Sequence, residues 1–160
     1  MLVVGMNSYI TVSEAEELLQ GDRLCDAFAA LPEVIREKLL KDAALRVDSL
    51  PYAGRKSRSD QMMEFPREGM TEIPYRVKLA QAVEAVSVLD SEAEERRRMV
   101  EQGVIAVTVG KVSESYAGHS GTSNRGNQTD TDKSWDKVGL KTRTAYYLLK
   151  TYMVKSARIS

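Results

Sequence analysis

Hydrophobic residues near the start of the chain recur at the three- and four-residue spacing of a helix. In NSYITVSEAEELLQG, Thr11 is followed three positions later by Glu14, which is the pattern of a capping box. The apolar stripe that follows consists of Val12, Ala15, Leu18 and Leu19. The pattern predicts a turn and a short helix here, and a second short helix in RLCDAFAAL.

Residues 32–50 carry a stronger helical pattern. Pro32 suits the first turn of a helix, where no backbone N–H is needed, and Pro51 marks the end. The apolar face has four-residue spacing, with Ile35, Leu39, Ala43 and Val47, and it is widened by Leu40 and Ala44. We expect one amphipathic helix over this stretch.

Residues 74–103 predict one long helix that outlasts its apolar stripe. The helix would open at Pro74 and close at Gly103, and the stripe fades beyond Asp90. Beyond that point, glutamate and arginine residues alternate as i,i+4 pairs, which favours a solvent-exposed extension. The stripe itself consists of Leu79, Ala82, Val83, Val86 and Leu89.

The period then changes from helical to alternating. Two β-rich runs, Val104–Val109 and Lys111–Tyr116, flank Gly110 and predict a hairpin or bulged ribbon over about residues 104–116. An isolated two-stranded ribbon is marginally stable in water. We therefore expect it to pack on helices or on strands of a neighbouring chain.

A polar tract separates this ribbon from the C-terminal residues. Residues 118–135 contain no aliphatic side chain and predict a flexible tether between a helical core with the ribbon at 1–117 and a tail at 136–160. The tail predicts a helix with Leu140, Tyr147, Leu148 and Thr151 on one side. The predicted fold class is mainly α: a small helical bundle with one long helix, a ribbon and a tethered C-terminal helix.

Composition restricts the function more than it identifies one. The 160 residues fit one domain, and the 23 Lys and Arg balance the 23 Asp and Glu, so the whole molecule has no net attraction to nucleic acid. Cys25 is the one cysteine and His119 the one histidine, which excludes an intramolecular disulfide and a Cys/His zinc site. We find no phosphate-binding glycine loop and no nucleophile elbow, and we expect no enzymatic activity, cofactor or metal. The sequence predicts a soluble, cytoplasmic protein without a signal peptide or membrane span.

Two features exceed this background. The first is the non-helical stretch between Pro51 and Pro74, which places Arg55, Lys56 and Arg58 close together and continues into Phe65-Pro66-Arg67. Phe65 and its neighbours are interpreted as an anchor of this loop on the core, and the three cations as a surface for DNA phosphates, a subunit contact or an acidic partner.

The second feature is the basic, tyrosine-bearing C-terminus. It is open to two interpretations, which are compatible: a final helix that closes the core, or a tethered segment that docks on a partner.

Several motifs together resemble a known family. In order, they are NSYITVSEAEELL, FPREG, IPYRVKLAQAVEAVSVL, KVSESYAG and LLKTYM. This series resembles the head–tail connector, or adaptor, proteins of tailed bacteriophages and prophages. Phe65 departs from the pattern, since such proteins commonly place tryptophan before the Pro-Arg pair. Relatives of this pattern are sometimes labelled primosomal-type single-stranded-DNA-binding proteins, which is the alternative function.

The connector resemblance implies a set of partners and a location. It implies a helical protein in a twelve-membered ring under the portal protein of the virion, with a stopper or tail-completion protein below, DNA passing through the channel and no membrane. Assembly would take place in the bacterial host cytoplasm. Docking on the portal would fall to Leu140, Tyr146, Tyr147, Leu148, Tyr152 and Met153.

The single-stranded-DNA alternative makes different demands. It calls for aromatic side chains within a basic groove. Four of the seven tyrosines lie toward the C-terminal end, namely Tyr116, Tyr146, Tyr147 and Tyr152.

Overall fold

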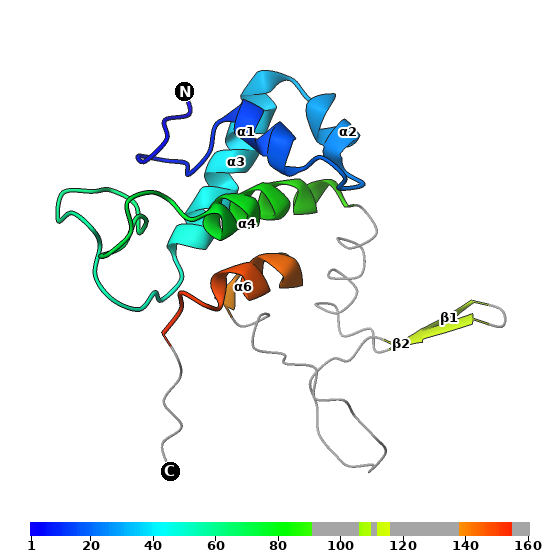
Figure 1. Cartoon of the computed structure of the whole chain (residues 1–160). Helices are drawn as coiled ribbons and strands as arrows, with labels where there is room; N and C mark the ends of the chain where they lie inside the picture. Colours follow the sequence, from blue (N-terminus) through cyan, green and yellow to red (C-terminus); the bar gives the residue numbers. More distant parts are fainter. Residues whose placement is uncertain (91–105, 110–111, 116–137, 155–160) are drawn as a thin grey trace, which may run out of the picture. The chain divides into compact units, whose positions relative to one another are not determined.

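The computed structural model describes residues 1–90, 106–109, 112–115 and 138–154, and it divides into two units (Figure 1). The first unit joins Met1–Leu89 to Lys133–Ser160, and the second is Asp90–Asp132. Among the described residues the fold is mainly helical, as predicted. The first unit contains α1 (Val12–Leu18), α2 (Cys25–Ala29), α3 (Glu33–Asp48), α4 (Tyr75–Val86), the short 3-10 helix η1 (Ser87–Leu89) and α6 (Arg143–Leu149).

The predicted capping box at the start of α1 is confirmed. The hydroxyl of Thr11 accepts a hydrogen bond from the backbone N–H of Glu14 at 3.1 Å. In return, the Glu14 carboxylate accepts one from the N–H of Thr11 at 2.9 Å. Two N–H groups that the helix leaves unpaired are thereby satisfied, which fixes the first residue of α1.

The helix predicted after Pro32 is also confirmed, and its buried face is narrower than the sequence pattern. Pro32 occupies the N-cap position of α3 and the helix ends at Asp48. Ala43 and Val47 at the end of the stripe are buried, whereas Leu39 is partly buried and Ile35 near the start is 38% exposed. The core contribution of α3 comes from Leu40, Ala43, Ala44 and Val47.

The long helix expected over 74–103 ends earlier within the described residues. α4 stops at Val86 and continues into η1. The hydroxyl of Ser87 donates a hydrogen bond to the carbonyl of Glu84 at 2.7 Å, so the side chain competes with the backbone pattern of a continuing helix. The predicted extension over residues 91–103 lies outside the described residues.

α4 is the central helix of the first unit, and it is buried on two sides. In Figure 1 it runs between α6 on one side and α1 and α3 on the other. Val77 and Ala80 belong to a core cluster shared with α3, α6 and the loop after α3. Ala82 and Ala85 belong to a second cluster shared with α1, α2 and α3. Both clusters therefore depend on α4.

A polar residue of α4 joins the N-terminal segment to this core. The Gln81 side chain has no exposure, and its oxygen accepts from the backbone N–H of Tyr9 at 2.8 Å. Its nitrogen donates to the hydroxyl of Ser8 at 2.7 Å and to the carbonyl of Leu40 at 2.9 Å. Burial of this amide is tolerated because its oxygen and its nitrogen both have partners.

α6 faces the core with a different side from the one predicted. The expected stripe included Tyr147 and Thr151, but both are exposed. α6 instead buries Ala145, Tyr146 and Leu149, with Leu140 just before the helix also in the core. Within residues 138–154, the part of the tail that the structure describes, the helix is also shorter than predicted, since α6 spans Arg143–Leu149.

The second unit contains two short strands. β1 (Ala106–Val109) and β2 (Val112–Ser115) pair antiparallel, with Val109 opposite Val112. They lie within the two β-rich runs of the sequence. The predicted tether over 118–135, with His119, lies outside the described residues.

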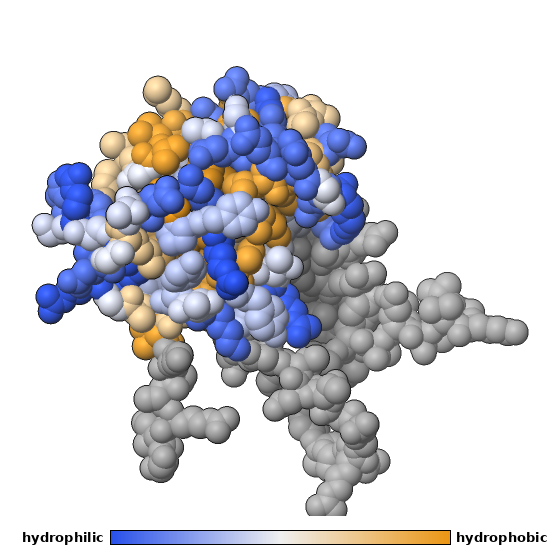
Figure 2. Space-filling view, in the orientation of Figure 1, coloured by the Kyte–Doolittle hydropathy of each residue, from blue (hydrophilic) through white to orange (hydrophobic). Residues whose placement is uncertain are grey.

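The described ranges carry neither a helix suited to a membrane nor a cluster suited to a metal ion. Within them, no helix combines the length and apolar character that crossing a bilayer requires. The same residues hold no group of three or more His, Cys, Asp or Glu side chains placed to bind a metal ion. Figure 2 shows hydrophilic residues over much of the visible face, interrupted by apolar patches.

Candidate nucleic-acid interface

The exposed side of α6 combines one aromatic ring with two cations. Tyr147 is 40% exposed, and the guanidinium carbon of Arg143 lies 5.3 Å from the centre of its ring. The ammonium of Lys150 lies 5.6 Å from the same ring centre. These are cation–π distances, so both charges are held beside the aromatic ring. We refer to Arg143, Tyr147 and Lys150 as the α6 cluster.

A second tyrosine supports the cluster from within the core. Tyr146 is buried, and its ring meets the ring of Tyr147 edge to face, with centres 5.6 Å apart. The Lys150 ammonium lies 5.6 Å from the centre of the Tyr146 ring as well. The Arg143 guanidinium also donates a hydrogen bond to the Tyr147 hydroxyl at 3.2 Å. Tyr147 is therefore exposed yet held in position.

A buried carboxylate positions the start of α6. Glu84 on α4 accepts from the backbone N–H groups of Lys141 at 2.6 Å and Thr142 at 3.1 Å, and from the Thr142 hydroxyl at 3.0 Å. Its charge is paired with Arg46 of α3, with Nε 2.8 Å from the carboxylate. Thr142 in turn caps α6 by accepting from the N–H of Ala145 at 3.2 Å. A negative group at a helix N-terminus is favourable, so Glu84 fixes α6 on α4.

The basic and aromatic character continues from α6 to the start of α4. Arg76 donates a hydrogen bond to the hydroxyl of Thr151 at 3.4 Å, which brings its charge to the end of α6. Its neighbour Tyr75 is 64% exposed. Beyond the α6 cluster, the start of α4 thus adds the cation of Arg76 and the exposed ring of Tyr75.

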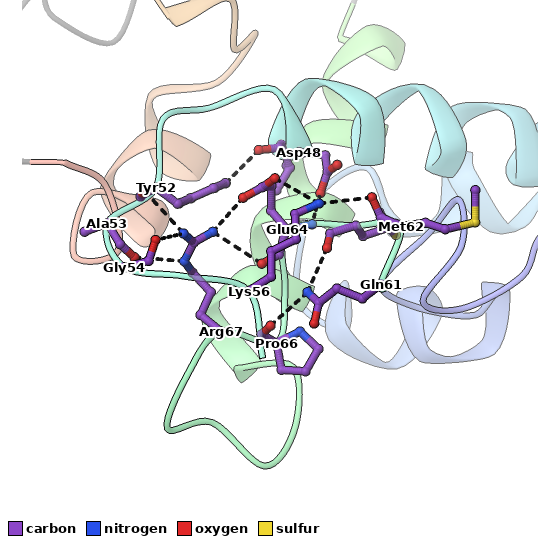
Figure 3. Close-up of polar contacts among 12 residues, drawn as sticks. Asp48, Tyr52, Ala53, Gly54, Lys56, Gln61, Met62, Glu64, Pro66 and Arg67 are labelled. Atoms are coloured by element: carbon purple, nitrogen blue, oxygen red, sulfur yellow. Dashed lines mark hydrogen bonds and ion pairs between the residues drawn. The ribbon is translucent and has the colours of Figure 1, made fainter. Parts of the chain in front are cut away.

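The three predicted loop cations have different environments. Arg58 pairs with Asp60 at 2.6 Å, and both side chains are largely exposed. Lys56 lies 3.2 Å from the carboxylate of Glu64 (Figure 3). Arg55 is exposed, and it forms no ion pair with any residue in the described part of the chain. Of the three, Arg55 is therefore the cation whose charge is least compensated.

Phe65 and Arg67 lie inside the loop structure. The Phe65 ring is 1% exposed and meets three tyrosine rings edge to face: Tyr52 at 4.7 Å, Tyr152 at 5.4 Å and Tyr9 at 6.0 Å. Phe65 precedes Pro66 through a cis peptide bond. Phe65 therefore packs in the core between the loop and the chain that follows α6.

Arg67 uses its donors on the loop itself (Figure 3). Its guanidinium donates to the backbone carbonyls of Ala53 at 2.8 Å, Gly54 at 2.5 Å and Tyr52 at 3.4 Å. It also donates to the Glu64 carboxylate at 2.6 Å and to the Glu64 carbonyl at 3.4 Å. A guanidinium has five N–H donors. This side chain therefore has none left for a phosphate.

Burial and hydrogen bonding act in opposite directions on the pKa of Glu64. Partial burial acts to raise it, but the hydrogen bonds and charges of Arg67 and Lys56 outweigh burial and hold the pKa below its ordinary value. The carboxylate is therefore charged at neutral pH and holds the two cations in the loop.

Most of the residues predicted to dock on a partner pack within the chain. Leu140 and Tyr146 are core residues, and Leu148, Tyr152 and Met153 are partly buried against the same cluster. Met153 pairs with Tyr52 in an isolated antiparallel bridge, and the N–H of Ala53 donates to the carbonyl of Tyr152 at 2.9 Å. Of the six, Tyr147 is the side chain that the structure leaves exposed.

Arg143 and Lys150 were not among the site residues predicted from the sequence, although a signal was present. Arg143, Tyr147 and Lys150 are separated by four and three positions, which places them on one face of a helix. Arg76 carried no such signal, because its proximity to Thr151 arises only from the packing of α4 against α6.

Comparison with known proteins corrects the assignment to phage connectors. A family model matches residues 1–154, and it is not a model of a head–tail connector family. The connector function and the virion and portal-binding roles are therefore wrong. The twelve-membered ring, the portal and stopper partners and the virion location were implied by that resemblance alone and have no support.

The family match favours the alternative function named from the sequence. No curated protein matches the chain. No solved structure matches it either. The matching model is described as "Putative DnaT-like ssDNA binding protein", and with residues 1–154 of 160 covered, the chain belongs to that family.

Proposed function

We propose that this protein binds single-stranded DNA through the α6 cluster. The observation that carries the proposal is Tyr147, an exposed ring with Arg143 and Lys150 beside it on one helix. Proteins that bind single strands combine aromatic rings, on which bases stack, with cations that follow the phosphates. Membership of the family supports the same ligand. The proposed activity is binding, with no chemical step.

The two cations have a second role in this proposal. In the free protein, each lies near the Tyr147 ring, where it is attracted by the electron-rich face. A base that stacks on the ring displaces one of them, and the displaced cation then pairs with the neighbouring phosphate. The two cations thus contact the Tyr147 ring in the free protein, and one of them contacts a phosphate in the complex.

The local charge supports this interface even though the chain is neutral overall. No Asp or Glu follows Asp136 in the sequence, whereas α6 and the residue after it carry Arg143 and Lys150. Arg76 adds a third positive charge beside Thr151. A local patch of positive charge attracts phosphates even when the molecule as a whole has no net charge.

Binding should depend little on base sequence and strongly on salt, since phosphate contacts dominate such interfaces. The test is fluorescence anisotropy of a labelled oligodeoxythymidine, with unlabelled single-stranded and double-stranded competitors of equal length. We expect displacement by the single strand at lower concentration. Equal displacement by the duplex, or no binding, would contradict the proposal.

A further inference from the structure

An open pocket adjoins the end of α6 and is not part of the α6 cluster. Its volume is about 190 Å³, and it lies between the loop after Pro51 and the residues Thr151 and Tyr152. Thr151 follows Lys150 directly and accepts the hydrogen bond from Arg76. Thr151, which lines the pocket, therefore follows the α6 cluster directly in the chain.

The walls of the pocket are fixed by backbone hydrogen bonds. The N–H of Ala53 donates to the carbonyl of Tyr152 at 2.9 Å, and the N–H of Val154 donates to the carbonyl of Pro51 at 3.0 Å. On the other side, the N–H of Glu68 donates to the carbonyl of Arg55 at 2.9 Å. The pocket is therefore formed before any ligand arrives, which is typical of binding sites.

The lining residues supply both flat apolar surface and polar groups. Tyr152 and Met70 offer apolar contacts to a ring, while Arg55 places an exposed cation at the rim. Arg67 also lines the pocket, but its N–H donors are used by the loop carbonyls and Glu64. Among the lining residues, Arg55 is thus the exposed cation suited to a phosphate, and Glu68 is the exposed residue that carries a carboxylate.

The size and chemistry of the pocket restrict its ligand. Pockets for drug-sized molecules span about 300–1,000 Å³, so this pocket suits a smaller group such as one nucleobase. A carboxylate such as that of Glu68 accepts hydrogen bonds from the exocyclic amino group of cytosine. Thymine has no exocyclic amino group and cannot make this bond.

We propose that the pocket takes one unstacked base of the bound strand and that Glu68 favours bases carrying an exocyclic amino group. This inference rests on the proposed function, because the α6 cluster would deliver the strand. It adds a modest base preference to an interface that otherwise contacts only ring faces and phosphates.

The test compares three strands of equal phosphate number: oligodeoxycytidine, oligodeoxythymidine and an abasic strand. With the unaltered protein we expect oligodeoxycytidine to bind about two- to tenfold more tightly than oligodeoxythymidine, the range of one net hydrogen bond. Glu68→Ala should abolish this difference. Glu72→Ala, at a nearby exposed glutamate that does not line the pocket, should preserve it.

A second variant tests occupancy of the pocket. Ala53→Leu fills part of the volume while keeping the backbone hydrogen bond to Tyr152. It should weaken oligodeoxycytidine binding about fivefold or more, the lower end for loss of one stacked base, and leave the abasic strand unaffected. Ala27→Leu, at an exposed alanine of α2, is the matched control. Thermal unfolding of each variant checks that the fold is kept.

The outcomes separate this inference from the proposed function. If Tyr147→Ala weakens oligodeoxycytidine and oligodeoxythymidine binding while Ala53→Leu changes neither, single-strand binding stands and the base pocket is refuted. If Ala53→Leu weakens the abasic strand equally, the pocket holds a phosphate and the base preference is refuted. If no strand binds the unaltered protein, both proposals fail.

Discussion

The carboxylate of Glu84 on α4 accepts hydrogen bonds from both the backbone N–H and the hydroxyl of Thr142, the residue that caps α6. The two residues are 58 positions apart in the sequence. Through this contact the charge buried in the central helix determines where the C-terminal helix begins. The α6 cluster therefore depends on a residue that cannot itself touch a ligand, because the Glu84 side chain has no exposure.

We expect Glu84→Ala to destabilise the fold strongly. The substitution removes the buried partner of Arg46 and leaves the N–H groups of Lys141 and Thr142, just before α6, without their acceptor. Removing one partner of a buried ion pair lowers the free energy of unfolding by about 3–5 kcal/mol. Urea unfolding followed by circular dichroism measures the change in the free energy of unfolding.

The matched control removes the other carboxylate that Arg46 contacts. Asp42 is 56% exposed and pairs with Arg46 within α3. Asp42→Ala should change the free energy of unfolding by about 1 kcal/mol or less, since exposed ion pairs contribute little. Equal effects of the two substitutions would show that α6 is held mainly by its apolar contacts.

Tyr147→Ala should weaken binding to single-stranded DNA without unfolding the protein. The ring is 40% exposed, so little core contact is lost, whereas a stacked base contributes about 1–3 kcal/mol to binding. Tyr147→Phe keeps the ring and should retain most of the affinity. Anisotropy titrations with oligodeoxythymidine measure both variants. An alanine variant that binds as tightly as the parent would exclude stacking on this ring.

The salt dependence of binding should report the cations of the α6 cluster. Each phosphate contact on a single strand contributes about −0.7 to the slope of log K against log salt concentration. Arg143→Ala and Lys150→Ala should each reduce the magnitude of the slope by about that amount. Lys38→Ala, at an exposed lysine of α3, should leave it unchanged. Parallel lines for all four proteins would place the phosphates elsewhere.

Acid should destabilise the loop around Glu64. Its pKa in the folded protein lies below the ordinary value of 4.5, so its contribution to stability is present above that pH and is lost as pH falls through the folded pKa. Glu64→Gln should make the free energy of unfolding less dependent on pH below about 4.5. At neutral pH the variant should be less stable, because Arg67 loses its charged partner.

Stability measured by urea unfolding across this pH range tests the assignment. Glu72→Gln is the control, at an exposed loop glutamate, and it should follow the parent curve. A Glu64→Gln curve parallel to that of the parent would mean that the carboxylate contributes no proton-linked stability.

The helix starts were predictable because their signals are local. The Thr11 and Glu14 pair forms within one helical turn, and Pro32 favours the first turn through its own restricted backbone. No distant contact is needed for either. The same holds for the loop after Pro51, in which the structure has no helix or strand.

The buried side of α6 could not be predicted, because the helix is short and has apolar residues on more than one side. Tyr146 and Tyr147 are adjacent and chemically identical, yet one is 6% and the other 40% exposed. Contacts with α4, made by its core residues and by Glu84, determine which of the two tyrosines is buried. Period alone does not contain that information.

Arg67 was assigned to the loop anchor from the sequence, but its hydrogen-bond partners could not be predicted, for a similar reason. Arg55, Lys56, Arg58 and Arg67 lie in one loop, and the sequence does not show which acceptors the guanidinium of Arg67 meets. These contacts arise when the carbonyls of residues 52–54 turn toward a single guanidinium. Only the folded loop brings these acceptors together.

The central position of α4 also bears on synthesis. A nascent chain that has emerged only as far as residue 90 already carries the apolar side chains Val77 and Ala80, but it lacks the helix that covers them in the finished fold. During this interval the ribosome-bound chain has an apolar surface without its covering helix, and Glu84 has Arg46 as a partner but lacks the N–H groups of Lys141 and Thr142. Such intermediates are the species that aggregate and that chaperones capture.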